Sequence, residues 1–222
     1  MCTLEKRGNL FILTLIGDDE HRLNPTLIAS VLDALSQAKA QSTRGSALVT
    51  VAQGRFFSNG FDLAWAQSAG SKQGAQERLL HMVKIFKPIV AALLSLPMPT
   101  VAAVTGHASA AGFALALSHD YIIMRRDRGV LYMSEVDIGL TLPDYFNALF
   151  EEKIGLFRAR RDFLLAGLKM KGNEAEKRGI VEAAYDSEDE VREASLRMAE
   201  TLAKRKWDGE VYAEIRKSFV GF

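Results

Sequence analysis

Short apolar runs alternate with amphipathic segments along the first 125 residues. The runs are uninterrupted, as in strands buried on both faces of a sheet, and lie at 10–16, 47–51, 100–104 and 121–124. Between the first two, apolar residues recur at helical spacing: Leu27, Ile28, Val31, Leu32 and Leu35. A second, longer helix is expected at about 75–94. This alternation predicts an α/β fold built of βα units with right-handed crossovers.

Local signals place several ends of these elements. The turn-prone Arg7-Gly8-Asn9 predicts that residues 2–6 form a hairpin strand before the first apolar run. Asn24-Pro25 predicts a helix start, because asparagine is a good N-cap and proline suits the first helical position. A shorter helix is expected at 113–118. Beyond Gly155 the chain becomes helical and more charged, and it ends in two amphipathic helices at about 188–206 and 209–220.

Composition excludes several classes of protein. The chain has 222 residues, 48% hydrophobic and 25% charged, with 28 Lys+Arg against 27 Asp+Glu, so its near-zero net charge argues against nucleic acid or an anionic membrane as partner. No segment reaches the ~20 apolar residues of a membrane span. The single cysteine, Cys2, cannot form an internal disulfide. Met1 to Arg7 resembles no signal peptide, and Ser218 to Phe222 carries no Ser-Lys-Leu-type address. We therefore expect a soluble intracellular protein.

The common cofactor and nucleophile motifs are absent. The sequence contains no G-x-G-x-x-G dinucleotide fingerprint, no phosphate-binding P-loop and no G-x-S-x-G elbow. Its four histidines have no metal-ligand spacing, so we expect no metal site. The run Lys204-Arg205-Lys206 is typical of the exposed face of a terminal helix, with a phosphate contact as the alternative.

Three segments together suggest a function. Phe56 to Leu63 follows one buried strand, Gly106 to Ala114 follows the next, and Tyr132 to Leu140 comes third. Their order and spacing resemble the crotonase (enoyl-CoA hydratase/isomerase) superfamily, and within it the plant-type peroxisomal Δ3,Δ2-enoyl-CoA isomerases. The resemblance implies a crotonase-like ββα spiral core at 1–187 and a C-terminal α-helical oligomerisation region at 188–222.

The resemblance also implies an oxyanion hole. In the family, backbone N–H groups of the first two segments bind the thioester carbonyl of an acyl-CoA, and by position these would belong to Phe61 and Ala111. Many members have glycines where this chain has Ala110-Ala111. The alternative is that Gly60 and Gly106 are turn residues and Ala110 to Gly112 is tight helix packing. Substrate contacts are expected along the first segment and near the CoA entry, at Ser58, Asn59, Gly60, Asp62, Leu63, Gly112 and Asn24, with Arg22 a weaker candidate.

The third segment contains the expected acid/base. Hydratases hold a water between two glutamates; Ala114 stands at the position of one and Glu135 at the other, so the single carboxylate resembles the isomerases. An apolar pocket would raise the pKa of Glu135, with walls expected from Phe113, Tyr132, Met133, Val136, Ile138 and Leu140. Alternatively, Ser134 caps a helix whose first turn favours acids such as Glu135 and Asp137. Asp144 is the reserve base. Asp62 is also expected to cap a short helix, and Asp120 to anchor a helix-to-strand turn.

The resemblance thus implies an isomerase that moves the double bond of a 3-cis or 3-trans-enoyl-CoA to the 2-trans position. Its partners would be an acyl-CoA substrate and copies of itself in a homotrimer or hexamer. No cofactor is implied, because coenzyme A is part of the substrate, and the location would be peroxisomal. The alternatives are another crotonase-type enzyme, such as a hydratase or thioesterase, and a non-catalytic binding or scaffold subunit.

Overall fold

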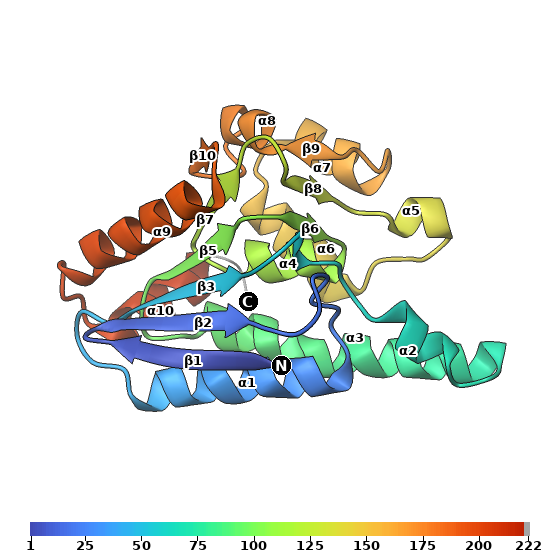
Figure 1. Ribbon diagram of the computed structural model, residues 1–222, viewed down its shortest axis with the longest axis horizontal. Helices are drawn as coiled ribbons and strands as arrows, with labels where there is room; N and C mark the ends of the chain where they lie inside the picture. The colour runs from blue at the N-terminus through green and yellow to red at the C-terminus, as the bar shows by residue number, and fades with distance from the viewer. Residues whose placement is uncertain (220–222) are drawn as a thin grey trace.

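The computed structural model describes residues 1–219, and a six-stranded sheet forms its centre (Figure 1). The strands lie in the order β1 (Cys2–Arg7), β2 (Leu10–Leu15), β3 (Ala47–Ala52), β5 (Thr100–Val104), β7 (Tyr121–Arg125) and β10 (Ala183–Tyr185). β1 pairs with β2 in an antiparallel hairpin, and the other pairs are parallel. The predicted hairpin and the four predicted strands are confirmed, with ends that differ by one residue.

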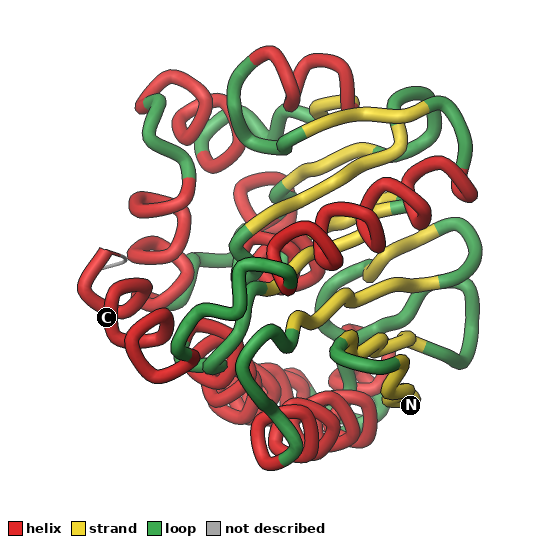
Figure 2. The backbone as a smooth tube through the Cα atoms, turned by 90° about the vertical axis from the view of Figure 1, so that its left-hand side faces the viewer, coloured by secondary structure: helices red, strands yellow, loops and turns green. Residues whose placement is uncertain are grey.

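Helices cover both faces of this sheet (Figures 1 and 2). On one face α1 (Pro25–Ala40) packs beside α3 (Lys72–Leu94), and on the other α9 (Glu188–Ala203) crosses β3, β5 and β7. The sheet therefore separates two apolar clusters, the smaller of which lies between α9 and the strands. Since α9 is packed into the same unit as the sheet, residues 1–187 and 188–219 share one core.

A second sheet lies in segments expected to be loops. Its four strands are β4 (Phe56–Ser58), β6 (His107–Ser109), β8 (Val130–Tyr132) and β9 (Met170–Lys171). We predicted a loop at 53–62 and a close-packed segment at 105–112, so the strands there correct the prediction. Strands of two or three residues are too short to show a period in the sequence. This sheet carries α2 (Leu63–Gln67) after β4, α4 (Ala111–Leu117) after β6 and α5 (Glu135–Ile138) after β8.

The remaining helices are α6 (Asp144–Lys153), α7 (Phe157–Leu164), α8 (Gly172–Lys177) and α10 (Gly209–Phe219). The last was expected to reach residue 220, which lies outside the described residues. α3 begins earlier than expected because the Ser71 hydroxyl accepts the Gly74 N–H at 3.0 Å. Within residues 1–219, no helix is both long and apolar enough to cross a membrane.

Candidate active site

The first two predicted segments meet at the ends of β4 and β6. These strands are parallel neighbours, with Phe56 opposite His107 and Ser58 opposite Ala108. Gly60 follows β4 in the left-handed region at φ +74°. A β-carbon added to Gly60 would lie 3.0 Å from the Ala110 Cβ and 3.4 Å from the Ala111 nitrogen. The Gly60 backbone therefore lies directly against the start of α4.

Both predicted oxyanion donors are free to bind a ligand. Within residues 1–219, neither the Phe61 N–H nor the Ala111 N–H donates a hydrogen bond. Ala111 is the first residue of α4, where a backbone N–H has no partner inside its own helix. Two adjacent, unpartnered N–H groups are the donor set that stabilises an enolate oxygen.

Phe61 is fixed by contacts on its backbone and its ring. On the backbone side, the Leu23 N–H donates to the Gly60 carbonyl at 2.8 Å, and the Asp62 N–H donates to the Leu23 carbonyl at 3.3 Å. The Phe61 ring stands edge-on to Phe86 of α3 at 5.6 Å and stacks on Phe146 of α6 at 6.4 Å. These contacts orient the Phe61 donor before any substrate arrives.

Ala110 has a strained backbone beside the second donor. Its φ of 51° and ψ of −124° are rarely adopted by residues with a β-carbon. The Ala110 N–H donates to the Tyr132 carbonyl of β8 at 2.9 Å, which helps to hold this conformation. The family's usual glycine would adopt it freely. This chain therefore stores strain at the point where the oxyanion loop turns into α4.

Gly112 is required by packing rather than by a turn. A β-carbon there would come within 2.2 Å of the Ser58 carbonyl oxygen, so only glycine lets α4 approach β4 this closely. The tight packing that we considered as an alternative is therefore present, and it coexists with the free N–H of Ala111.

The polar side chains predicted to bind substrate also hold the loops together. The buried Ser58 hydroxyl donates to the His21 carbonyl at 2.8 Å, and the Asn59 Oδ1 accepts the Ser109 hydroxyl at 3.1 Å. The predicted caps are confirmed. Asn24 accepts the Leu27 N–H at 3.0 Å to cap α1, and Asp62 accepts the Trp65 N–H at 2.9 Å to cap α2.

Contact between these residues and a substrate stays a prediction. Leu63, the first residue of α2, is half-buried, and so is Arg22 near the same loop. The bracing partners His21 and Ser109 were not predicted, because nothing local in the sequence marks a long-range contact.

Glu135 is the first residue of α5, three residues after the strand whose end holds Ala110. Its side chain is half-buried, and its Oε2 atom is buried without a hydrogen-bond partner. Burial raises the pKa of Glu135, against the lowering effect of backbone N–H groups at Glu135 and Ser134. The alternative based on capping is wrong in its detail, because the Ser134 side chain makes no capping bond. Glu135 therefore has the environment of a general base.

The expected wall around Glu135 is only partly correct. Phe113 and Met133 are buried, whereas Val136, Ile138 and Leu140 are 48%, 50% and 38% exposed. α5 has four residues and leaves these apolar side chains on the surface. Ala114 is fully buried, and the reserve base Asp144 is exposed at the start of α6. In the part of the chain that the structure describes, no group of three or more His, Cys, Asp or Glu side chains could hold a metal.

Comparison with known proteins identifies the family. The enoyl-CoA hydratase/isomerase family model matches residues 14–219. The chain belongs to this family. It is 68% identical to the peroxisomal enoyl-CoA delta isomerase 2 of Arabidopsis thaliana over 219 residues, which are 98% of this chain and 91% of the relative. It is 50% identical to enoyl-CoA delta isomerase 1 of the same plant, covering 99% of this chain and 90% of the relative.

Solved structures of the family have the same fold. An enoyl-CoA isomerase from Mycobacterium tuberculosis superposes with a TM-score of 0.86 at 22% identity, over 99% of this chain and 91% of that one. An enoyl-CoA hydratase from Mycobacterium ulcerans gives a TM-score of 0.87, also at 22% identity, over 99% and 91% of the two chains. The predicted crotonase fold is confirmed, including the presence of C-terminal helices.

Proposed function

We propose that this chain shifts the double bond of 3-cis and 3-trans-enoyl-CoA esters to the 2-trans position, in the β-oxidation of unsaturated fatty acids. The observation that carries the proposal is one half-buried carboxylate, Glu135, close in the fold to two free backbone donors, with alanine where a hydratase has its second glutamate. The relatives at 50–68% identity are named enoyl-CoA delta isomerases, which supports it.

In the proposed mechanism Glu135 moves one proton between two carbons. Its carboxylate removes a proton from C2 of the 3-enoyl-CoA, and the electrons spread over C2 to C4 and the thioester oxygen as a dienolate. The N–H groups of Phe61 and Ala111 stabilise the negative oxygen, at roughly 2.7–4 kcal/mol for each donor. The same carboxyl group then returns the proton to C4, which leaves the 2-trans double bond.

The environment of Glu135 suits this exchange. An acid that both accepts and returns a proton works best when its pKa lies near the working pH, and burial shifts the pKa of Glu135 upward. Because Oε2 has no protein partner, the carboxyl group can reorient between C2 and C4 without breaking a hydrogen bond. We propose that no prosthetic group takes part, because the thioester itself makes the C2 proton acidic.

We further propose a peroxisomal location, as the names of two Arabidopsis relatives indicate, and assembly into a homotrimer or hexamer through the C-terminal helices. The exposed apolar side chains Phe157 and Leu165, next to or within α7, are 68% and 72% exposed and would gain from such burial. Light scattering coupled to size-exclusion chromatography measures this state directly.

A pair of substrates tests the proposed reaction. The wild-type chain is assayed for conversion of 3-hexenoyl-CoA to 2-trans-hexenoyl-CoA and, in parallel, for addition of water to crotonyl-CoA. We expect rapid isomerisation and little hydration. Hydration as fast as isomerisation would favour a hydratase that recruits its second acid elsewhere. Binding of both esters without turnover would instead indicate a scaffold subunit.

A further inference from the structure

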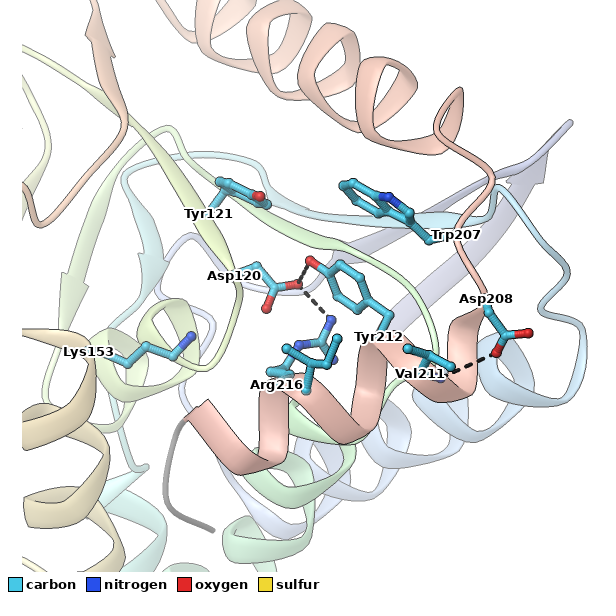
Figure 3. Close-up of a pocket in the computed structure, with 9 residues that line it drawn as sticks. Asp120, Tyr121, Lys153, Trp207, Asp208, Val211, Tyr212 and Arg216 are labelled. Atoms are coloured by element: carbon cyan, nitrogen blue, oxygen red, sulfur yellow. Dashed lines mark hydrogen bonds and ion pairs between the residues drawn. The ribbon is translucent and has the colours of Figure 1, made fainter.

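A second cavity lies at the opposite end of the main sheet from the candidate active site. It has a volume of about 450 Å³ and opens between the start of β7, the end of α6 and helix α10 (Figure 3). The candidate active site follows strands that run away from this end, whereas the cavity borders Asp120 and Tyr121, where β7 begins. Nothing in the proposed reaction uses this cavity.

Most of the cavity wall is apolar. Trp207 stacks on Tyr212 with ring centroids 5.4 Å apart, and both rings face the cavity together with Tyr121 (Figure 3). Val211 and Ile215 of α10 form the outer rim and are 57% and 65% exposed. A linear hydrocarbon chain laid along this wall would cover the two exposed aliphatic side chains and contact the aromatic rings.

Charges at the closed end leave one cation over. The Asp120 carboxylate pairs with Arg216 at 2.7 Å and also accepts the Tyr212 hydroxyl at 3.2 Å. Asp208 at the other side pairs with Arg44 at 2.6 Å. Lys153 makes no ion pair with any residue in 1–219, and its ammonium donates only to the His119 carbonyl, at 3.0 Å. Burial lowers the pKa of Lys153, as expected of an ammonium group that lacks an anionic partner.

Arg216 supplies an independent sign that a polar group is missing from the cavity. Its side chain is 95% buried, and both terminal nitrogens are satisfied, by Asp120 and by carbonyls that follow α3. Its Nε atom is buried without a partner. Buried guanidinium nitrogens are seldom left unpaired, so an acceptor is expected near this end of the cavity.

We propose that this cavity binds an amphipathic monoanion, a medium-chain carboxylate. Its carboxylate pairs with the Lys153 ammonium, and its alkyl chain lies against Trp207, Val211 and Ile215. The surplus of one positive charge favours a monoanion, because the carboxylates of Asp120 and Asp208 repel ligands with several negative charges. The site is separate from the acyl-CoA site, so a bound fatty acid would be sensed independently of turnover.

Tryptophan fluorescence can follow this cavity alone. The chain has two tryptophans, and Trp65 lies on α2 beside the candidate active site. In a Trp65→Phe background Trp207 is the only reporter, so binding at the acyl-CoA site leaves little signal. Decanoate is titrated into this protein and into versions carrying Lys153→Met or, as a matched control, Lys177→Met on the exposed end of α8. Decylamine serves as the ligand of opposite charge.

We expect saturable decanoate binding that is at least tenfold weaker with Lys153→Met, unchanged with Lys177→Met and absent for decylamine. Isomerase activity should be the same in all three proteins, which also shows that Lys153→Met is folded. Equal decanoate affinity with Lys153→Met, or equal affinity for decylamine, would overturn the proposal. It is also overturned if decanoate leaves Trp207 emission unchanged while iodide quenching of Trp207 falls with protein concentration, because a second copy of the chain then covers the cavity.

Discussion

The N–H of Ala111 can be removed without removing a side chain that contacts anything else. Proline is well tolerated at the first position of a helix, and Ala111 holds that position in α4. Its N–H has no partner in residues 1–219, so the substitution breaks no hydrogen bond of the fold. A proline ring would, however, meet the Cβ of Ala110 at its ψ of −124°, because residues before proline are restricted. The test therefore uses Ala110→Gly as the background.

The expected magnitude follows from the donor's role. Ala110→Gly alone should keep activity and lose little stability, because relief of about 1–2 kcal/mol of left-handed strain offsets the entropy cost of glycine. Adding Ala111→Pro should lower kcat about 10²–10³-fold relative to that background, the usual effect of losing one oxyanion donor. Stopped assays with 3-hexenoyl-CoA measure the rate, and circular dichroism melts check the fold. A folded double variant with kcat within about threefold of Ala110→Gly would refute the assignment of this donor.

Three further predictions concern stability. His119 is fully buried, which lowers its pKa to about 4; since the unfolded value is near 6.5, up to about 3 kcal/mol of stability present above pH 6.5 is lost as the pH falls towards 4. Urea unfolding at pH 7 and 4.5 should show this loss, and His119→Gln should abolish it. Asp120→Asn removes the partner of a buried Arg216 and should cost about 3–5 kcal/mol, seen as a fall in Tm; an unchanged Tm would contradict it. Because burial raises the pKa of Glu135, its contribution to stability is full below the ordinary value and is lost as the pH rises through the raised one, so Glu135→Gln should melt above wild type, by a margin that grows with pH.

The sequence predicted the parts of the fold that depend on local chemistry and strong burial. Uninterrupted apolar runs such as 47–51 gave the main strands, and the side chains of Asn24 and Asp62 gave helix starts that the structure confirms. The second sheet was missed because strands such as β4 and β6 have three residues and are defined by their neighbours.

Around the candidate site, tertiary contacts decided what the sequence could not. The left-handed backbone of Ala110 accompanies a bond to Tyr132 from another segment, and no local signal marks it. The walls expected around Glu135 failed at Val136, Ile138 and Leu140, because residue type does not tell which side of a four-residue helix faces the solvent. The free N–H of Ala111, by contrast, followed from the resemblance, because a backbone donor does not depend on the side chain.

The central claim is that one carboxylate, Glu135, carries the proton between two carbons. The most direct measurement is the kcat of Glu135→Gln for 3-hexenoyl-CoA, beside Asp144→Asn as a control carboxylate on the exposed start of α6. The one-base mechanism predicts a loss of at least 10²–10⁴-fold with Glu135→Gln and near-normal activity with Asp144→Asn. A folded Glu135→Gln enzyme with near wild-type activity, or loss only with Asp144→Asn, would contradict it.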